Sequence, residues 1–319
     1  MLKEKGMDSP RLDAEVLLAH CLGMERVGLY VNSYKDLNPE AGQRYFSLVE
    51  RRGRGEPVAY ITGVKEFMGL DFTVTPDVLI PRPETELLVE AALAAIATRG
   101  RFSVSHFSGS RGELFPSRTS FANCDREPSP CRIVDVGTGS GAIAVSLAGR
   151  LPGAKVYALD ISLEALSVAR VNAQRHGVAD RIVFLCGDLL GPLPGEIRGA
   201  VDLIAANLPY VPSGEIPGLM PDVGLYEPHT ALDGGHDGLD FYRRLIPMAE
   251  SFLRPGGTLL MEIAPGQGEK LTQTVLPGDG SACGNGGKGP WELSPCRTRQ
   301  AGILLDLAGR ERLVAASFG

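Results

Sequence analysis

Residues 133–141 carry the sequence IVDVGTGSG, in which a short β-branched run leads into three glycines spaced two apart. The run 132–136 predicts a buried strand, and residues 142–150 predict the helix that follows it. Glycine permits positive φ and close backbone approach, so a nucleoside-bearing ligand can lie across such a turn, near the positive end of the helix. The stretch therefore predicts an α/β fold with a ligand site at the turn.

The glycine spacing narrows the ligand class. It is GxGxG rather than the GxGxxG of dinucleotide binders, and it lacks the Gly-Lys-Ser/Thr of a P-loop. A tight strand-to-helix turn without a ligand is the alternative for the loop alone.

Carboxylates follow the next two predicted strands. Asp160 ends the strand 155–160, about twenty residues beyond the loop, where a ribose-binding acid is expected. A carboxylate is a pure acceptor and has room for both ribose hydroxyls. Asp188 follows the strand 182–185 and could accept from an adenine amino group, with Leu189 against the ring. A helix cap or turn is the alternative for each aspartate.

A second motif, Asn207-Leu208-Pro209-Tyr210, ends the predicted strand 201–206. An amide nitrogen is a poor nucleophile, so a site for it must accept from its N–H groups and aim its lone pair. The Asn207 side-chain oxygen and the Leu208 carbonyl can accept, Pro209 stiffens the backbone, and the Tyr210 ring can pack on the planar group. The alternative is an ordinary Asn-x-Pro turn.

Together the motifs resemble the S-adenosylmethionine loop of Rossmann-like methyltransferases and the Asn-Pro-Pro-Tyr signature of enzymes that methylate planar nitrogens. The chain as a whole resembles the protein-(glutamine-N5) methyltransferases that act on peptide chain release factors. The most distinctive match is residues 78–86, VLIPRPETE, of which the segment 81–86 separates this family from other amino-methyltransferases. The resemblance also covers residues 11–20, 56–63, 226–228, 231–235 and 306–312.

This resemblance implies an α/β fold: a Rossmann-like, seven-stranded S-adenosylmethionine-dependent methyltransferase domain, parallel except for one reversed strand near the C-terminus, preceded by a small helical domain. We expect a helical substrate-docking domain over residues 1–68, a hairpin linker over 69–78 and the catalytic domain over 79–319. Two segments with little apolar periodicity, 101–130 and 277–300, are expected to be mobile insertions.

The resemblance also implies residue roles. The cofactor S-adenosyl-L-methionine would be held by Gly137, Thr138, Gly139, Ser140, Gly141, Asp160, Asp188, Leu189 and Asn207. The glutamine amide of a Gly-Gly-Gln tripeptide would be held by Asn207, Leu208, Pro209 and Tyr210, of which Asn207, Pro209 and Tyr210 are the catalytic candidates. The entrance used by the tripeptide would be lined by Arg82, Glu84 and Thr85. For Arg82 and Glu84 the alternative is a local surface salt bridge.

Composition adds limits. The net charge of −6 does not favour nonspecific nucleic-acid binding, and the six cysteines have neither zinc spacing nor a disulfide pattern. We expect no metal, no direct nucleic-acid contact, no membrane segment, and a monomer in the cytoplasm.

Two alternative functions stay open. Leu208 stands where a proline is commoner, which would loosen the turn, and Asn-Leu-Pro-Tyr also occurs in enzymes that dimethylate adenine in ribosomal RNA. An adenine amino group and a glutamine amide are both planar NH2 groups, so the motif alone does not separate the leading function from adenine-N6 methylation. The acidic charge balance argues against a nucleic-acid enzyme. The third possibility is a catalytically silent binding module that keeps the fold.

Overall fold

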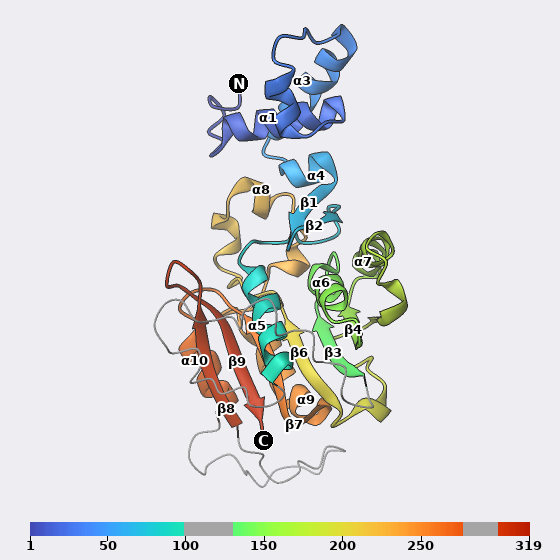
Figure 1. Ribbon diagram of the computed structural model, residues 1–319. Coiled ribbons are helices and arrows are strands. Elements are labelled where there is room, and N and C mark those ends of the chain that lie inside the picture. Colours follow the sequence, from blue (N-terminus) through green and yellow to red (C-terminus); the bar gives the residue numbers. More distant parts are fainter. Residues whose placement is uncertain (99–129, 277–298) are drawn as a thin grey trace.

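The computed structural model describes residues 1–98, 130–276 and 299–319. The protein has two parts, a helical domain at one end and a larger α/β domain at the other, with a two-stranded hairpin between them (Figure 1). The predicted insertions 101–130 and 277–300 lie almost entirely outside the described residues. No helix in the described ranges is long and apolar enough to span a bilayer.

The α/β domain is built on a seven-stranded sheet with the order β5-β4-β3-β6-β7-β9-β8. Every described pairing in this sheet is parallel except those of β9, which runs antiparallel to both of its neighbours. This confirms the predicted methyltransferase sheet with its single reversed strand. The strands are β3 (Cys131–Val136), β4 (Ala154–Asp160), β5 (Ile182–Cys186), β6 (Val201–Ala206), β7 (Leu253–Glu262), β8 (Arg299–Leu305) and β9 (Glu311–Phe318).

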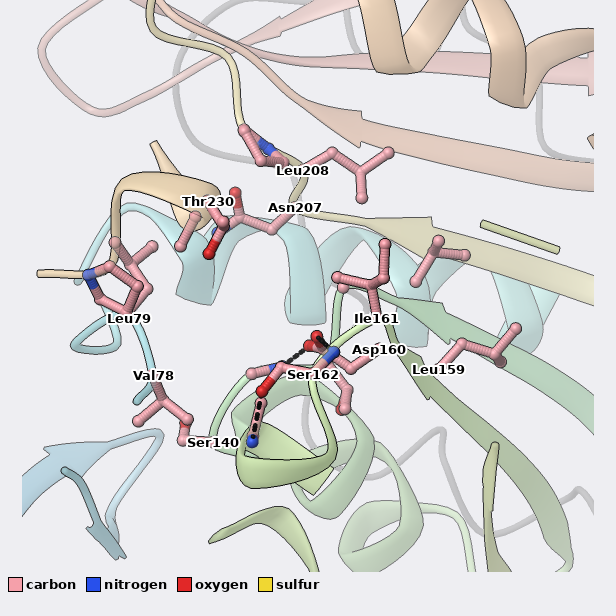
Figure 2. A pocket seen from close by; sticks show the side chains of 18 of the residues that line it. Val78, Leu79, Ser140, Leu159, Asp160, Ile161, Ser162, Asn207, Leu208 and Thr230 are labelled. Carbon is pink, nitrogen blue, oxygen red and sulfur yellow. Dashed lines mark hydrogen bonds between the residues drawn. The ribbon is translucent and has the colours of Figure 1, made fainter. Parts of the chain in front are cut away.

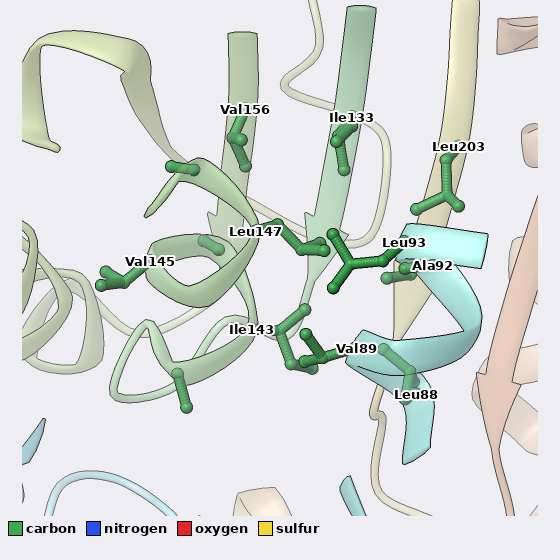
Figure 3. Packing of buried hydrophobic residues seen from close by; sticks show 14 of the residues in the cluster. Leu88, Val89, Ala92, Leu93, Ile133, Ile143, Val145, Leu147, Val156 and Leu203 are labelled. Carbon is green, nitrogen blue, oxygen red and sulfur yellow. The ribbon is translucent and has the colours of Figure 1, made fainter. Parts of the chain in front are cut away.

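Helices cover both faces of the sheet because successive residues of each central strand point to opposite sides. Ile133 and Leu203 pack with α5 (Thr85–Thr98) and α6 (Ala142–Arg150) on one face, as Figure 3 shows. Val134 and Ile204 pack on the other face with α9 (Asp240–Phe252) and α10 (Gly268–Val275). The remaining helices of this domain are α7 (Leu163–Arg175), α8 (Pro221–Gly224) and the short 3-10 turns Ala179–Arg181, Gly195–Ile197, Ile216–Gly218 and His229–Ala231.

The N-terminal domain is helical, as predicted, and has its own small core. Leu17, Val49 and Ile61 are buried together there. Two contacts tie the domain to the segment around α8: Arg52 lies 3.7 Å from Asp222, and the Tyr226 hydroxyl donates to the Arg54 carbonyl at 3.2 Å. The helices are α1 (Pro10–Leu22), α2 (Arg26–Val31), α3 (Pro39–Gly53) and α4 (Val58–Thr62).

Several predicted boundaries differ from the structure. The strands β3, β4 and β5 are each one residue longer than predicted, and the hairpin linker and the second insertion differ by more. The hairpin consists of β1 (Val64–Phe67) and β2 (Leu70–Thr73), so the linker predicted at 69–78 starts too late. Its turn is Met68-Gly69, with φ of 55° and 79°, and methionine is not a residue that signals positive φ.

The remaining points concern the second half of the sheet. Strand β7 begins at Leu253, which pairs with Val201 before a register shift, and it includes residues 254–257. Strand β8 begins at Arg299, so the predicted insertion 277–300 extends two residues too far. Both strands are held by pairing to distant partners, which local turn residues do not reveal.

Candidate active site

A cavity of about 470 Å³ opens at the carboxyl ends of the parallel strands, where doubly wound sheets bind ligands. Asn207 and Thr230 lie on one side of it, and Asp160 and Ser162 lie on the other (Figure 2). The lining comes from residues 77–79, 81, 82, 85, 136–140, 142, 143, 159–162, 165, 187–189, 207–209, 228–231, 233 and 241.

The glycine loop forms the floor between β3 and α6. Gly137, Gly139 and Gly141 all have positive φ, at 73°, 53° and 81°. A Cβ on Gly137 would lie 3.0 Å from Leu208 Cδ2 and 3.2 Å from the Asn207 carbonyl oxygen. The loop thus touches the second motif directly, and glycine is required at Gly137 by both conformation and space.

Asp160 ends β4 and fixes this loop. Its Oδ2 accepts from the Gly139 N–H at 2.8 Å, and its Oδ1 accepts from the Ser162 N–H at 3.0 Å. Burial raises the pKa of the Asp160 carboxyl, and the backbone N–H donors lower it in part. The helix cap is not Asp160 but Ser162, whose hydroxyl oxygen accepts from the Ala165 N–H at 3.0 Å. The cap alternative for Asp160 is therefore wrong, and the carboxylate keeps lone pairs facing the cavity.

Asp188 and Leu189 line the cavity beyond β5. The Asp188 carboxylate is paired with Arg244 and is half exposed. Leu189 is buried and has a φ of 48°, a strained value for a leucine. Such a backbone is held by its surroundings, and the Leu189 side chain belongs to the core beneath α9.

Asn207 follows β6 and enters the cavity from the sheet. Its Nδ2 donates to Thr85 Oγ1 on α5 at 3.2 Å. The next backbone N–H, of Leu208, donates to the Tyr242 hydroxyl at 3.3 Å. A proline at position 208 would have no N–H for Tyr242, and the Leu208 side chain is buried.

Tyr210 lies behind the cavity lining instead of in it. Its hydroxyl donates to Glu262 Oε1 at 3.3 Å, and its backbone carbonyl accepts from Gln267 Nε2 at 2.9 Å. Burial, first of all, raises the pKa of the Tyr210 hydroxyl, and the Glu262 charge adds to this. The Tyr210 hydroxyl is therefore a hydrogen-bond donor to Glu262 and does not act as a base at neutral pH.

The segment before α5 forms the opposite wall. Arg82 lines the cavity and pairs at 2.5 Å with Glu227, whose side chain is 1% exposed. The partners are 145 residues apart, so this is not the local surface pair that was the alternative for Arg82. Glu84 lies outside the lining, 3.5 Å from Arg312.

Two parts of the chain match known protein-family models. Residues 1–63 match the PrmC N-terminal domain, and residues 128–272 match a methyltransferase domain. A release factor glutamine methyltransferase of Moorella thermoacetica is 45% identical over 314 residues, covering 98% of this chain and 92% of that protein. The enzyme of the same name from Geobacter sulfurreducens is 44% identical over 270 residues, covering 85% and 82%.

The chain belongs to the release factor glutamine methyltransferase family. This confirms the resemblance inferred from the sequence. Among solved structures, the catalytic domain of hMettl16 in complex with the MAT2A 3'UTR hairpin 6 superposes with a TM-score of 0.51. It covers 88% of this chain and 83% of its own, but at 14% identity it shows the shared fold alone.

For a member of this family, the structure gathers most of the predicted site residues around one cavity. Those in its lining are Gly137, Thr138, Gly139, Ser140, Asp160, Asp188, Leu189, Asn207, Leu208, Pro209, Arg82 and Thr85. Gly141 closes the loop behind them against Ala169, while Tyr210 and Glu84 lie outside the lining.

Three buried side chains beneath the cavity were not among the residues predicted from the sequence. Asp135 is fully buried under the glycine loop, where its Oδ2 accepts from Thr138 Oγ1 at 2.7 Å and from the Ala144 N–H at 3.1 Å. Glu262 and Tyr242 are equally buried under the Asn207 motif. A carboxylate inside an apolar strand was the one available signal, visible at Asp135 and at the end of β7.

Proposed function

We propose that this chain transfers a methyl group from S-adenosyl-L-methionine to the side-chain N5 nitrogen of the glutamine in the Gly-Gly-Gln tripeptide of peptide chain release factors. The observation that carries the proposal is the placement of Asn207. Its side chain lines the cavity next to the glycine loop while its Nδ2 is already occupied by Thr85. Family membership supports the same substrate.

The cavity fits the cofactor. The glycine loop lines the cavity without side chains at Gly137 and Gly139, and a Cβ on Gly139 would meet no atom of the described residues within 4 Å. The Asp160 carboxylate, a hydrogen-bond acceptor, lines the cavity beside them. We assign Gly137, Thr138, Gly139, Ser140, Gly141, Asp160, Asp188, Leu189 and Asn207 to cofactor binding. When bound, the cofactor supplies a methyl group activated by a positively charged sulfur.

The chain's own residues act by orientation. The Asn207 Oδ1 and the Leu208 carbonyl accept from the two N–H groups of the glutamine amide, which directs the nitrogen lone pair at the methyl carbon. Pro209 stiffens the backbone directly after the Leu208 carbonyl, and Tyr210 supports the motif through Glu262. Arg82, Thr85 and, further out, Glu84 line the approach of the tripeptide. The nitrogen loses a proton after the new bond forms, so no strong base is required.

The helical domain, residues 1–68, is assigned to docking of the release factor away from its tripeptide. Large apolar side chains are exposed on it, among them Val27 at 69%, Val31 at 68% and Tyr34 at 79%. Exposed apolar groups gathered on one small domain are typical of a protein-binding surface. The enzyme would work as a cytoplasmic monomer, without direct nucleic-acid contact.

The test is methyl transfer from labelled cofactor to a purified release factor. We expect labelling of the whole factor, none of a factor whose tripeptide glutamine is replaced by alanine, and none of ribosomal RNA or DNA. Label in the nucleic acid would instead support the adenine-N6 alternative.

A second measurement addresses docking. The double variant Val31→Ser with Tyr34→Ser should raise KM for the whole release factor while leaving turnover of a short Gly-Gly-Gln peptide as in the parent. Glu40→Gln on the same domain is the matched surface control. An unchanged KM in the double variant would exclude this surface from docking.

A further inference from the structure

Glu262 is a buried acid placed directly beside the substrate-binding asparagine. It ends β7, and the parallel pairing of β6 with β7 sets Ala206 opposite Met261, so Asn207 and Glu262 follow side by side. Glu262 is 1% exposed. Its Oε1 accepts from the Tyr210 hydroxyl at 3.3 Å, and its Oε2 is buried without a hydrogen-bond partner among the described residues.

An asparagine side chain has nearly the same shape with its oxygen and nitrogen exchanged, but only the oxygen can accept from a glutamine N–H. The orientation of Asn207 must therefore be imposed by its neighbours. Asn207 Nδ2 donates to Thr85 Oγ1 at 3.2 Å. Thr85 has one hydroxyl proton, and the nearby Glu262 carboxylate has a buried oxygen, Oε2, without any other hydrogen-bond partner in the described part of the chain, so we assign the Thr85 proton to this oxygen. Thr85 can then only accept from Asn207.

We propose that Thr85 and Glu262 are positioning residues that hold the Asn207 amide with its nitrogen toward α5 and its oxygen toward the substrate. This deepens the proposed function and rests on it. The direction of each hydrogen bond in this series is set by the carboxylate at its end, because a carboxylate can only accept. Replacing that acceptor by a donor would let the Thr85 hydroxyl turn toward Asn207 and reverse the amide.

Glu262 also fixes the backbone of the motif. Its carbonyl oxygen accepts from the Tyr242 hydroxyl, and that hydroxyl accepts from the Leu208 N–H at 3.3 Å. One residue thus controls both the side chain of Asn207 and the peptide that follows it. The charged groups facing its carboxyl are Arg312, which favours the ionised form, and Glu84, which disfavours it.

The experiment compares three threonine variants on α5 in single-turnover methyl transfer to a release factor at saturating cofactor. Thr85→Val should lower the rate constant at least about tenfold, since one hydrogen bond to a charged network is lost. Thr85→Ser keeps the hydroxyl and should restore most of the rate. Thr98→Val, which removes an exposed hydroxyl bonded only within its own helix, should match the parent. Calorimetry should show parent-like cofactor affinity in all three.

A double-mutant cycle separates positioning from general damage. In an Asn207→Ala background, Thr85→Val should cause no further loss, because no amide is left to orient. Equal losses in both backgrounds, or a parent-like rate in Thr85→Val, would overturn the proposal. Glu262→Gln provides a second route, because its NH2 group can donate to Thr85 and should lower the rate as Thr85→Val does.

A readout without turnover keeps this inference distinct from the proposed function. In protein labelled with 15N at asparagine, the Asn207 side-chain NH2 signal is identified by its loss in Asn207→Ala. It should shift in Thr85→Val and Glu262→Gln but stay near its parent position in Thr85→Ser. An unmoved signal would overturn the positioning role. A parent enzyme that shows the expected shifts but does not methylate release factors would refute the proposed function alone.

Discussion

The two sides of the cavity are held in different ways. On the cofactor side, backbone hydrogen bonds hold the glycine loop: the N–H groups of Gly137 and Thr138 both donate to the Leu159 carbonyl at 2.9 Å. On the amide side, side chains from three distant elements hold the Asn207 motif, namely Thr85, Tyr242 and Glu262. Substitutions on the first side should therefore act mainly on cofactor affinity, and those on the second mainly on the rate of transfer.

The largest effect is expected on the amide side. Asn207→Ala should lower the rate constant for methyl transfer at least about a hundredfold, because one pre-placed contact in the transition state is worth roughly 2.7–4 kcal/mol. Cofactor affinity should change little. Single-turnover kinetics at saturating cofactor, with calorimetry alongside, measures both quantities.

Asn207→Asp is the matched variant for this prediction. It keeps acceptor oxygens but adds a charge that is costly to desolvate, and it cannot donate to Thr85. It should fail on glutamine as well. Parent-like transfer in Asn207→Ala would mean that Asn207 only shapes a turn, and the proposed mechanism would have to be abandoned.

The next effect belongs to the cofactor side. Asp160→Ala should weaken S-adenosylmethionine binding by roughly 1.5–3 kcal/mol, the scale of hydrogen bonds to a charged group. The change also frees the Gly139 and Ser162 N–H groups that Asp160 now accepts from. Asp71→Ala, on the exposed hairpin, is the control. Unchanged affinity in a folded Asp160→Ala protein would remove Asp160 from the site.

A glycine pair probes the point where the two sides meet. Gly137→Ala places a methyl group against Leu208 and the Asn207 carbonyl, so it should lower the transfer rate even at saturating cofactor. Gly139→Ala meets no atom within 4 Å and should cost only the strain of its positive φ, about 1–2 kcal/mol, felt in cofactor affinity. Both effects are read from the same single-turnover titration. Equal rate losses in the two variants would show that contact with Asn207 does not matter.

Sequence patterns predicted one side of the cavity better than the other for a physical reason. The glycine loop is local: strand, turn and helix are contiguous, the helix 142–150 has the predicted bounds, and the strand before the loop differs from its predicted start by one residue. The amide side joins Thr85 to Asn207 across 122 residues. Such partners meet only through sheet order and helix packing, so no local pattern indicates that Glu262 and Tyr242 lie beneath Asn207.

The same reason explains the misplaced boundaries. The hairpin turn at Met68-Gly69 is set by pairing of Val64 with Thr73, and its methionine gives no hint of positive φ. Strand β7 continues through Pro255 and Gly256, residues that normally end elements, because its neighbour β6 holds it.

The last expected effect concerns two buried acids, one under each side of the cavity. Burial is the main cause that raises the pKa of Asp135, under the glycine loop, to about 7 and the pKa of Glu262, under Asn207, to about 7. Their ordinary values are 3.8 and 4.5. Between about pH 4.5 and 7 the folded protein therefore binds more protons than the unfolded chain, so the free energy of unfolding falls as the pH rises.

Urea unfolding of the parent at pH 5, 6 and 7 should show this decline, at most about 1.4 kcal/mol per pH unit for each group. Groups with lowered pKa values, such as Asp237 at about 2, gain their stabilising charge below this window and do not mask it. Glu262→Gln and Asp135→Asn should each flatten the curve of unfolding free energy against pH.

The two sides of the cavity should also differ in kinetics. The transfer rate should rise with pH through about 7 in the parent and in Asp135→Asn, because only Glu262 must be ionised to orient Asn207. If the rate no longer rose with pH in Asp135→Asn, or still rose in Glu262→Gln, the cofactor side and the amide side would not act independently.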